Sequence, residues 1–538
     1  MGRTGSEQTP QRAEALAPLA VDPGPAPLLQ RLRTWPQRHL GLLVALLLLQ
    51  VVAYSYLFTL PILTDHTFPN SWLYPYPSFK TSGEGRWLAD VVIALQGGSG
   101  VPAVQMLAAA VLQAANGILF ASLLGVQRGP GQFLLAGLIC LHPAFLDYYS
   151  FAADHLSFVL GDSCALLAGW CLLRGQGSMR RLLGASLFNL LALSLYGPKI
   201  ALVLLLTLLV LLLRLVEAPA ALASRRGLLR EIALVAGSLL LAVLLFGLSA
   251  RLLISQPILP GAHVNAPGEM LRATLASYGK AKGYLLAMAG LPAGVLRGLP
   301  LFIVISGLLA LALRLRRHSW SQQALAAVAV LLLPVALNGP SIINSFSPTD
   351  RGRFVSAYAY LLVFCLAQTL RLRRLRLPVL ALASLLLWLF FSLAVQQANA
   401  AQFKSTYDLM SINRILVRLE PLIEVPSGAS EPQPVLVVGR YPAFALEPYV
   451  RWPGSTDAAH LLVNDTFAPY RQTEMLNHLL GRPLLRRPTA AEIEQALPRI
   501  QRTPPWPAPG SVFREGRTLV VVLEPWRSDV PLTWKLDQ

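Results

Sequence analysis

Long and almost uninterrupted hydrophobic runs constrain this chain more than any other feature of its sequence. The runs at 42–60, 200–216 and 379–395 are each close to the roughly 20 residues that cross a bilayer as a helix. They lack the alternation of apolar and polar positions that is typical of a membrane β-barrel strand. Charged residues make up only 13% of the chain, against about 25% in a soluble domain. We therefore predict a mainly α, polytopic membrane protein.

The net charge of +18 first suggests a nucleic-acid partner, but the distribution of the basic residues argues against one. Lysines and arginines punctuate the hydrophobic runs instead of forming one basic face. Arg180 and Arg181 stand in one short connection, and Arg225, Arg226 and Arg230 in another. This pattern follows the positive-inside rule and predicts a cytoplasmic N-terminus. The charge thus reports topology, and no nucleic-acid partner is expected.

The runs predict about eleven spans in a helix bundle, followed by a small domain of another kind. The spans fall near 40–60, 102–124, 131–147, 156–173, 182–197, 199–216, 231–249, 298–314, 321–338, 354–370 and 378–396. We expect a disordered cytoplasmic tail over 1–38, a transmembrane domain over 39–397 and an extracytoplasmic α/β domain over 398–538. In the last of these, 435–438 and 519–522 read as buried strands, and 470–480 and 489–498 read as helices.

The four cysteines lie inside apolar runs, where a cysteine behaves as a small hydrophobic residue. Cys164 and Cys171 are seven positions apart and share a helix face, but no CxxC pair or histidine partner accompanies them. The sequence therefore signals neither a disulfide framework nor a metal site.

The first predicted outside loop gathers charged and aromatic residues. Asp65 and His66 follow the end of the first span, and Arg86 comes after several aromatic residues. A carboxylate at this position can serve as a general base toward a hydroxyl. An interfacial loop with an aromatic belt explains the same residues, and for this loop alone it is the better explanation.

The second predicted outside turn contributes Tyr149, Asp154 and His155. An acidic residue this close to hydrocarbon costs a few kcal/mol unless it faces a cavity or a partner, so it is a functional candidate. Asp162, deeper in the next span, is another. The alternative is that Asp154 caps the helix, which would not exclude a catalytic role.

Three further cations stand at outside ends of spans. Lys199 follows Gly197 and Pro198, and Arg351 and Arg353 lie between the ninth and tenth spans. Arginine binds phosphate in a bidentate fashion, and these two arginines run against the positive-inside trend. They can also reach toward lipid headgroups without binding a substrate. We interpret Lys199, Arg351 and Arg353 as candidates for binding phosphate.

Several of these segments together resemble a known family. The loop over 61–90 with its GRWLAD element, the segment HPAFLDYYSFAADHLSF and the segment LALSLYGPKIAL are similar to the serotype-converting O-antigen glucosyltransferases, the Gtr type II group. The resemblance rests on the order and topology of these short motifs and extends over most of the chain.

The resemblance implies a membrane glycosyltransferase of the C type (GT-C). Such an enzyme moves a hexose, expected here to be glucose, from a polyprenyl-phosphate donor to a cell-envelope glycan such as the O-antigen of lipopolysaccharide. It implies Asp65 as the base and Asp154 as the second catalytic acid. His66, Arg86, Tyr149, His155, Lys199, Arg351 and Arg353 are the expected substrate-binding residues. The family often has two adjacent acids where this chain has Asp65 and His66, which weakens any argument for a metal.

The expected partners are the lipid-linked sugar, the acceptor glycan and membrane lipid, and no further cofactor is indicated. The expected location is the bacterial inner membrane, with the C-terminal domain in the periplasm. A lipid-linked glycan polymerase or ligase, or a flippase, is the alternative. A flippase should show paired repeats or broken helices with charges near mid-membrane, and the sequence has no convincing internal repeat.

Overall fold

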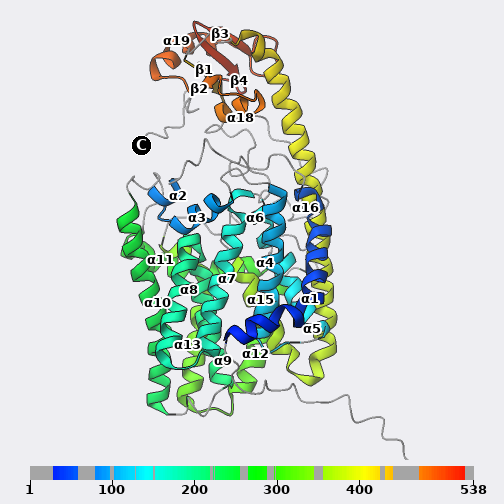
Figure 1. Ribbon diagram of the computed structural model, residues 1–538, viewed down its shortest axis with the longest axis vertical. Helices are drawn as coiled ribbons and strands as arrows, with labels where there is room; N and C mark the ends of the chain where they lie inside the picture. Colours follow the sequence, from blue (N-terminus) through cyan, green and yellow to red (C-terminus); the bar gives the residue numbers. More distant parts are fainter. Residues whose placement is uncertain are drawn as a thin grey trace, which may run out of the picture.

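The computed structural model describes residues 28–58, 79–96, 102–127, 129–149, 152–217, 222, 224–254, 265–286, 296, 298–343, 356–424, 431–439 and 472–527. Most of these residues form a bundle of long helices, and a small sheet lies beyond one end of it (Figure 1).

Each of the eleven predicted spans falls on a helix. These helices are α1 (Leu28–Ala53), α4 (Pro102–Leu123), α5 (Pro130–Leu141), α7 (Ala152–Arg174), α8 (Ser178–Leu195), α9 (Ile200–Glu217), α10 (Arg225–Leu253), α12 (Leu299–Leu315), α13 (Trp320–Leu337), α15 (Ser356–Leu370) and α16 (Arg376–Leu419). Six candidate spans are long and apolar enough to cross a membrane, and four further apolar helices are shorter. The chain is therefore a membrane protein, whereas the count of eleven crossings stays a prediction.

The other helical elements are α11 (Pro267–Leu286), a helix of 20 residues, and several short segments, most of them at the end of the bundle that faces the sheet. The short segments are η2 (Ser55–Phe58), α2 (Phe79–Ser82), α3 (Trp87–Leu95), η3 (Pro143–Phe145), α6 (Leu146–Tyr149), η4 (Gly197–Lys199), α14 (Gly339–Ile343), η7 (Arg373–Leu375) and η8 (Glu420–Leu422). In Figure 1, α2, α3 and α6 lie at this end, above the long helices.

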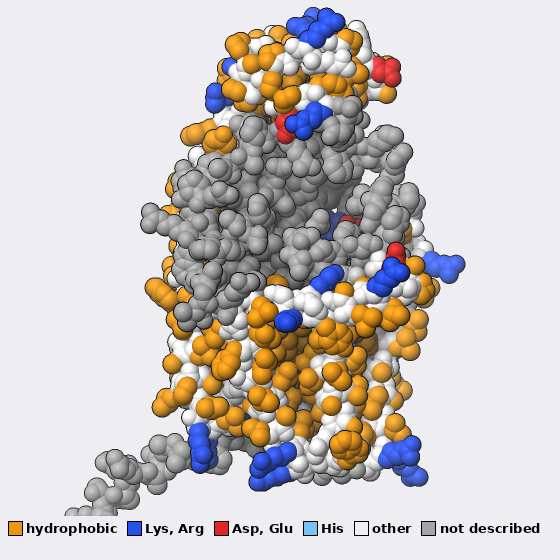
Figure 2. Space-filling model, turned by 180° about the vertical axis from the view of Figure 1, so that it is seen from behind, with side chains coloured by type: hydrophobic (Ala, Val, Ile, Leu, Met, Phe, Trp, Pro, Cys, Tyr) orange, Lys and Arg blue, Asp and Glu red, His pale blue; other side chains and the backbone are white. Residues whose placement is uncertain are grey.

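Small residues let the helices approach closely. A Cβ on Gly117 of α4 would lie 2.8 Å from the carbonyl oxygen of Ala136 on α5. A Cβ on Gly307 of α12 would lie 2.4 Å from the Cβ of Cys365 on α15. Membrane helices pack in this way because lipid supplies no hydrophobic drive for their association. The outward-facing side chains of the bundle are mainly hydrophobic, and Lys and Arg gather at the end away from the sheet (Figure 2).

The sheet has four strands in the order β2-β1-β4-β3. Its strands are β1 (Gln433–Val438), β2 (Leu485–Arg486), β3 (Val512–Glu515) and β4 (Thr518–Val522). β1 is parallel to both neighbours, and β3 and β4 form an antiparallel hairpin. The two predicted strands at 435–438 and 519–522 are thus central and pair with each other, Val435 opposite Leu519.

Helices cover both faces of this sheet. α19 (Ala490–Ile500) packs Ile493 and Ile500 against one face, and α18 (Gln472–Leu479) packs Met475 against the other. The last part of α16 joins α18 on its face, where Ile412 and Leu419 are fully buried. The span predicted to end at 396 therefore continues as one helix to Leu419. The reason is an amphipathic pattern after residue 404 that a hydropathy criterion does not detect.

The N-terminal boundary also differs from the expected one. α1 begins at Leu28, within the range 1–38 that the sequence predicts to be a disordered tail.

Candidate active site

A tight turn between α2 and α3 presents two cations to the bundle. Asp90, in the first turn of α3, accepts a hydrogen bond from the backbone N–H of Thr81 at 3.2 Å and another from its hydroxyl at 2.5 Å. The backbone N–H of Arg86 donates to the carbonyl of Lys80 at 2.7 Å. Gly85 has a φ of +68°, and a Cβ there would lie 3.1 Å from the Cβ of Ala250 on α10. The turn therefore needs glycine at this position, and it fixes Lys80 and Arg86 side by side.

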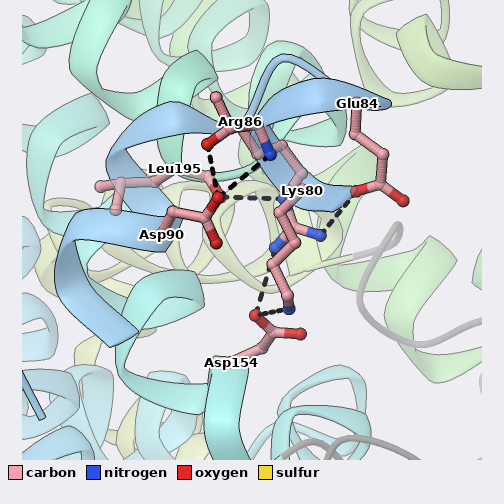
Figure 3. A network of polar contacts seen from close by, with 7 residues as sticks. Lys80, Glu84, Arg86, Asp90, Asp154 and Leu195 are labelled. Carbon is pink, nitrogen blue, oxygen red and sulfur yellow. Dashed lines mark hydrogen bonds and ion pairs between the residues drawn. The ribbon is translucent and has the colours of Figure 1, made fainter. Parts of the chain in front are cut away.

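Arg86 connects the turn to three other groups. Its Nε donates to the carbonyl of Leu195 at 3.2 Å, and its guanidinium pairs with Glu84 at 2.9 Å and with Asp154 at 3.4 Å (Figure 3). The ring centroid of Tyr196 lies 4.9 Å from its Cζ, which adds a cation–π contact. Burial opposes the charge of Arg86, but the carboxylates of Asp154 and Glu84 outweigh that effect and raise its pKa.

Lys80 and Arg86 converge on the same carboxylate. The Lys80 ammonium forms an ion pair with Asp154, and both side chains are almost completely buried. Burial lowers the pKa of Lys80 below its ordinary 10.5, although the charge of Asp154 acts in the opposite direction. Two cations on one carboxylate stabilise its anionic form. Asp154 is therefore suited to hold Lys80 and Arg86 in place, and we call Lys80, Glu84, Arg86 and Asp154 the loop cluster.

Asp154 occupies the first turn of α7, because that helix begins at Ala152, earlier than the sequence suggested. It is therefore inside the helix and is not the residue that caps it. An acidic side chain in the first turn is favoured by the helix dipole, so the position is stable without a catalytic reason.

A second ion pair lies farther along the same helix. Lys199 pairs with Asp162 at 2.5 Å and also donates to the Tyr148 hydroxyl, which itself lies 3.2 Å from Asp162. We call these three residues the helix cluster. All three side chains are essentially inaccessible, and Gly161 leaves the room that the Lys199 stem occupies. Asp154 and Asp162 are eight positions apart, about 12 Å along a helix axis, so the clusters are separate.

Tyr149 and His155 pack in the interior. Their rings lie 4.3 Å apart, and the ring of Tyr149 lies 4.3 Å from that of Tyr54 on the other side. Both are buried, and the Nδ1 of His155 has no hydrogen-bond partner among the residues described. This aromatic group lines the interior beside the start of α7.

The structure thus brings Arg86 and Asp154 together, whereas it places Lys199 in the helix cluster. Asp65, His66, Arg351 and Arg353 lie outside the described residues. Sequence reasoning missed Lys80. The signal was present, because Lys80, Glu84, Arg86 and Asp90 put four charges into eleven residues beside a predicted span. Among the described residues, no three histidine, cysteine or acidic side chains lie close enough together to hold a metal ion.

Comparison with known families gives one match that covers this site. The model of the family described as glucosyl transferase GtrII matches residues 74–368, more than half of the chain. The matched range includes both clusters, begins after Asp65 and His66 and ends before α16. Neither the curated proteins nor the solved structures gave a match.

Proposed function

Because the chain belongs to the glucosyl transferase GtrII family, we propose that it is a membrane glucosyltransferase that takes glucose from a polyprenyl-phosphate donor. The family agrees with the resemblance found in the sequence. The proposed acceptor is a lipid-linked or surface glycan such as O-antigen, and the proposed location is the bacterial inner membrane with the sheet on the periplasmic side.

One observation supports the donor class most directly: the loop cluster holds two buried cations at the end of an apolar bundle. A polyprenyl-phosphate sugar has an apolar tail and an anionic phosphate at its head. The bundle suits the tail, and cations near the helix ends suit the phosphate. Asp154 keeps Lys80 and Arg86 in position when no donor is bound.

The proposed reaction is a displacement at the anomeric carbon. The acceptor hydroxyl attacks that carbon, the bond from carbon to the phosphate oxygen breaks, and the hydroxyl proton passes to Asp65 as general base. Lys80 and Arg86 offset the negative charge that develops on the departing polyprenyl phosphate. The role of Asp65 rests on the resemblance, and that of the two cations on the geometry of the loop cluster.

The direct test is transfer by the full-length protein in proteoliposomes that contain an acceptor glycan. Glucose labelled on polyprenyl phosphate should appear on the acceptor, with release of polyprenyl phosphate. UDP-glucose should give no product. A flippase would move the donor without releasing polyprenyl phosphate, and that result would overturn the proposal.

Two variants separate the proposed roles. Asp65→Asn should abolish transfer and leave expression unchanged. The matched control is Arg251→Lys, an exposed residue at the end of α10 that keeps its charge, and it should transfer at the wild-type rate. Full activity of Asp65→Asn would show that Asp65 is not the general base. It would not bear on which donor the protein uses.

A further inference from the structure

A polar cavity lies at the end of the bundle away from the loop cluster. It has a volume of about 340 Å³ and is formed where the connection between α7 and α8 meets α9 and α10. Asp154 and Arg174 mark the two ends of α7, about 30 Å apart at 1.5 Å per residue. The cavity is therefore distinct from the proposed active site.

Its lining contains three arginines and one carboxylate. Arg181 is almost fully buried and forms a bidentate ion pair with Glu231, and its Nε donates to the carbonyl of Leu172 at 2.8 Å. Arg214 approaches the same carboxylate at 3.3 Å, and Arg230 donates to the Ser178 hydroxyl at 2.6 Å. Glu231 balances one of the three positive charges, so the lining has a net charge of +2.

Arg214 and Arg230 retain donors for a ligand. A guanidinium has five N–H donors, and the described residues use few of those on either side chain. The Nε of Arg214 faces Glu231 at 3.3 Å, so the terminal N–H groups of its guanidinium are the donors that remain for a ligand. Arg181 differs, because Glu231 and Leu172 occupy most of its donors.

Two helix N-termini add positive potential at the same place. α8 begins beside the cavity with Gly177 as its N-cap, which offers no side chain to the first N–H groups. α10 begins close by, and neither helix has an acidic residue in its first turn. Helix N-termini favour anions, and here arginines occupy the positions that acids would stabilise. An anion in the cavity would offset the repulsion between these arginines and the positive ends of the two helices.

We propose that this cavity binds a phosphate group, and that an anionic phospholipid headgroup is its source. Arg214 and Arg230 are the ligand-binding side chains. The buried pair of Arg181 and Glu231 positions Arg214, and the Ser178 hydroxyl orients Arg230. The volume lies within the range of small-ligand sites. Basic pockets between membrane helices are suited to anionic headgroups, and this one lies where the connection between α7 and α8 meets α9 and α10. The inference does not depend on glucosyl transfer.

The test measures binding to the full-length protein in neutral detergent. Short-chain phosphatidylglycerol, short-chain phosphatidylcholine and inorganic phosphate are titrated separately, and binding is followed by the midpoint of thermal unfolding and by native mass spectrometry. Saturable binding of phosphatidylglycerol alone supports a lipid source. Saturable binding of inorganic phosphate with the same dependence on Arg230 supports the phosphate site but assigns it to free phosphate.

Matched variants tie the binding to the cavity. Arg230→Gln should weaken binding roughly tenfold, because one charged contact is lost. Arg226→Gln makes the same change of charge at an exposed residue of α10 that does not line the cavity, and its affinity should stay at the wild-type value. Ser178→Ala, which removes the hydroxyl that orients Arg230, should weaken binding roughly threefold.

Two results would overturn the proposal. One is the absence of saturable binding by phosphatidylglycerol and by inorganic phosphate. The other is an equal loss of affinity in Arg230→Gln and Arg226→Gln. That result would show that the ligand responds to the net charge of this region and does not bind in the cavity. Both arginines are exposed, so both variants should unfold at the wild-type temperature without lipid.

Discussion

The loop cluster and the helix cluster both join a lysine to an aspartate of α7, yet they differ in the number of cations on that aspartate and in access. The helix cluster pairs one cation with one anion, adds a tyrosine hydroxyl and is closed on all sides. The loop cluster places two cations on Asp154 and extends to Glu84, whose side chain is 38% exposed. A closed pair of one cation and one anion suits a structural role. An arrangement with converging cations on short loops suits the binding of an anion.

The helix cluster should give the largest effect on stability. Asp162→Asn leaves the Lys199 ammonium buried without a counter-charge, and we expect a loss of about 3–5 kcal/mol in the free energy of unfolding. Unfolding in detergent, followed by circular dichroism, measures the loss. The double variant Asp162→Leu with Lys199→Met removes both charges and should recover most of the stability and the transfer activity. If the double variant is stable but has lost transfer, the helix cluster takes part in the reaction and is not only structural.

The loop cluster should give the largest effect on transfer in a folded protein. Arg86→Lys keeps the charge but loses the planar group that reaches Leu195, Glu84 and Asp154 at once. We expect about 2 kcal/mol of lost transition-state stabilisation, or roughly a thirtyfold lower kcat/KM. Steady-state rates in proteoliposomes measure it. A wild-type rate in this variant would reduce Arg86 to a packing residue.

The pKa of Lys80 predicts a smaller effect that depends on pH. Burial lowers this pKa below 10.5, so the ammonium loses its proton at a lower pH than an exposed lysine does. Transfer should therefore fall on the alkaline side, and Lys80→Arg should retain more of its neutral rate there. Between the lowered pKa of Lys80 in the folded chain and the ordinary 10.5 of the unfolded chain, the unfolded chain keeps a proton that the folded chain has released. The contribution of Lys80 to stability therefore rises with pH in this range. Identical alkaline profiles for the two proteins would argue against a role for charged Lys80.

The partly exposed pair of Arg486 and Glu492 gives the smallest effect. Their side chains are 26% and 23% exposed, and the hydrogen bond from Arg486 lowers the pKa of Glu492 to about 2. The pair's contribution is complete above the ordinary pKa of 4.5 and is lost as the pH falls toward 2. Arg486→Gln should cost under about 1 kcal/mol at neutral pH, measured by hydrogen exchange in α19. Arg482→Gln, at an exposed position before β2, is the control and should leave that exchange unchanged.

The sequence predicted the helices well because each one carries its own signal. Every hydrophobic run became a helix, and the apolar stretches at 435–438 and 519–522 became paired strands. The pairing of Asp162 with Lys199 joins residues 37 positions apart and depends on the packing of α7 against η4. The burial of Lys80 likewise depends on α7, since a lysine in a polar loop is ordinarily solvated.

The continuity of α16 has a mechanical consequence. Its 44 residues form a rod of about 66 Å that is anchored among the apolar helices at one end and against the sheet at the other. Each residue inserted midway would lift the sheet by about 1.5 Å and swing it by about 100° around the rod. The number of residues in α16 therefore sets both the distance of the sheet from the bundle and its rotation about the helix axis.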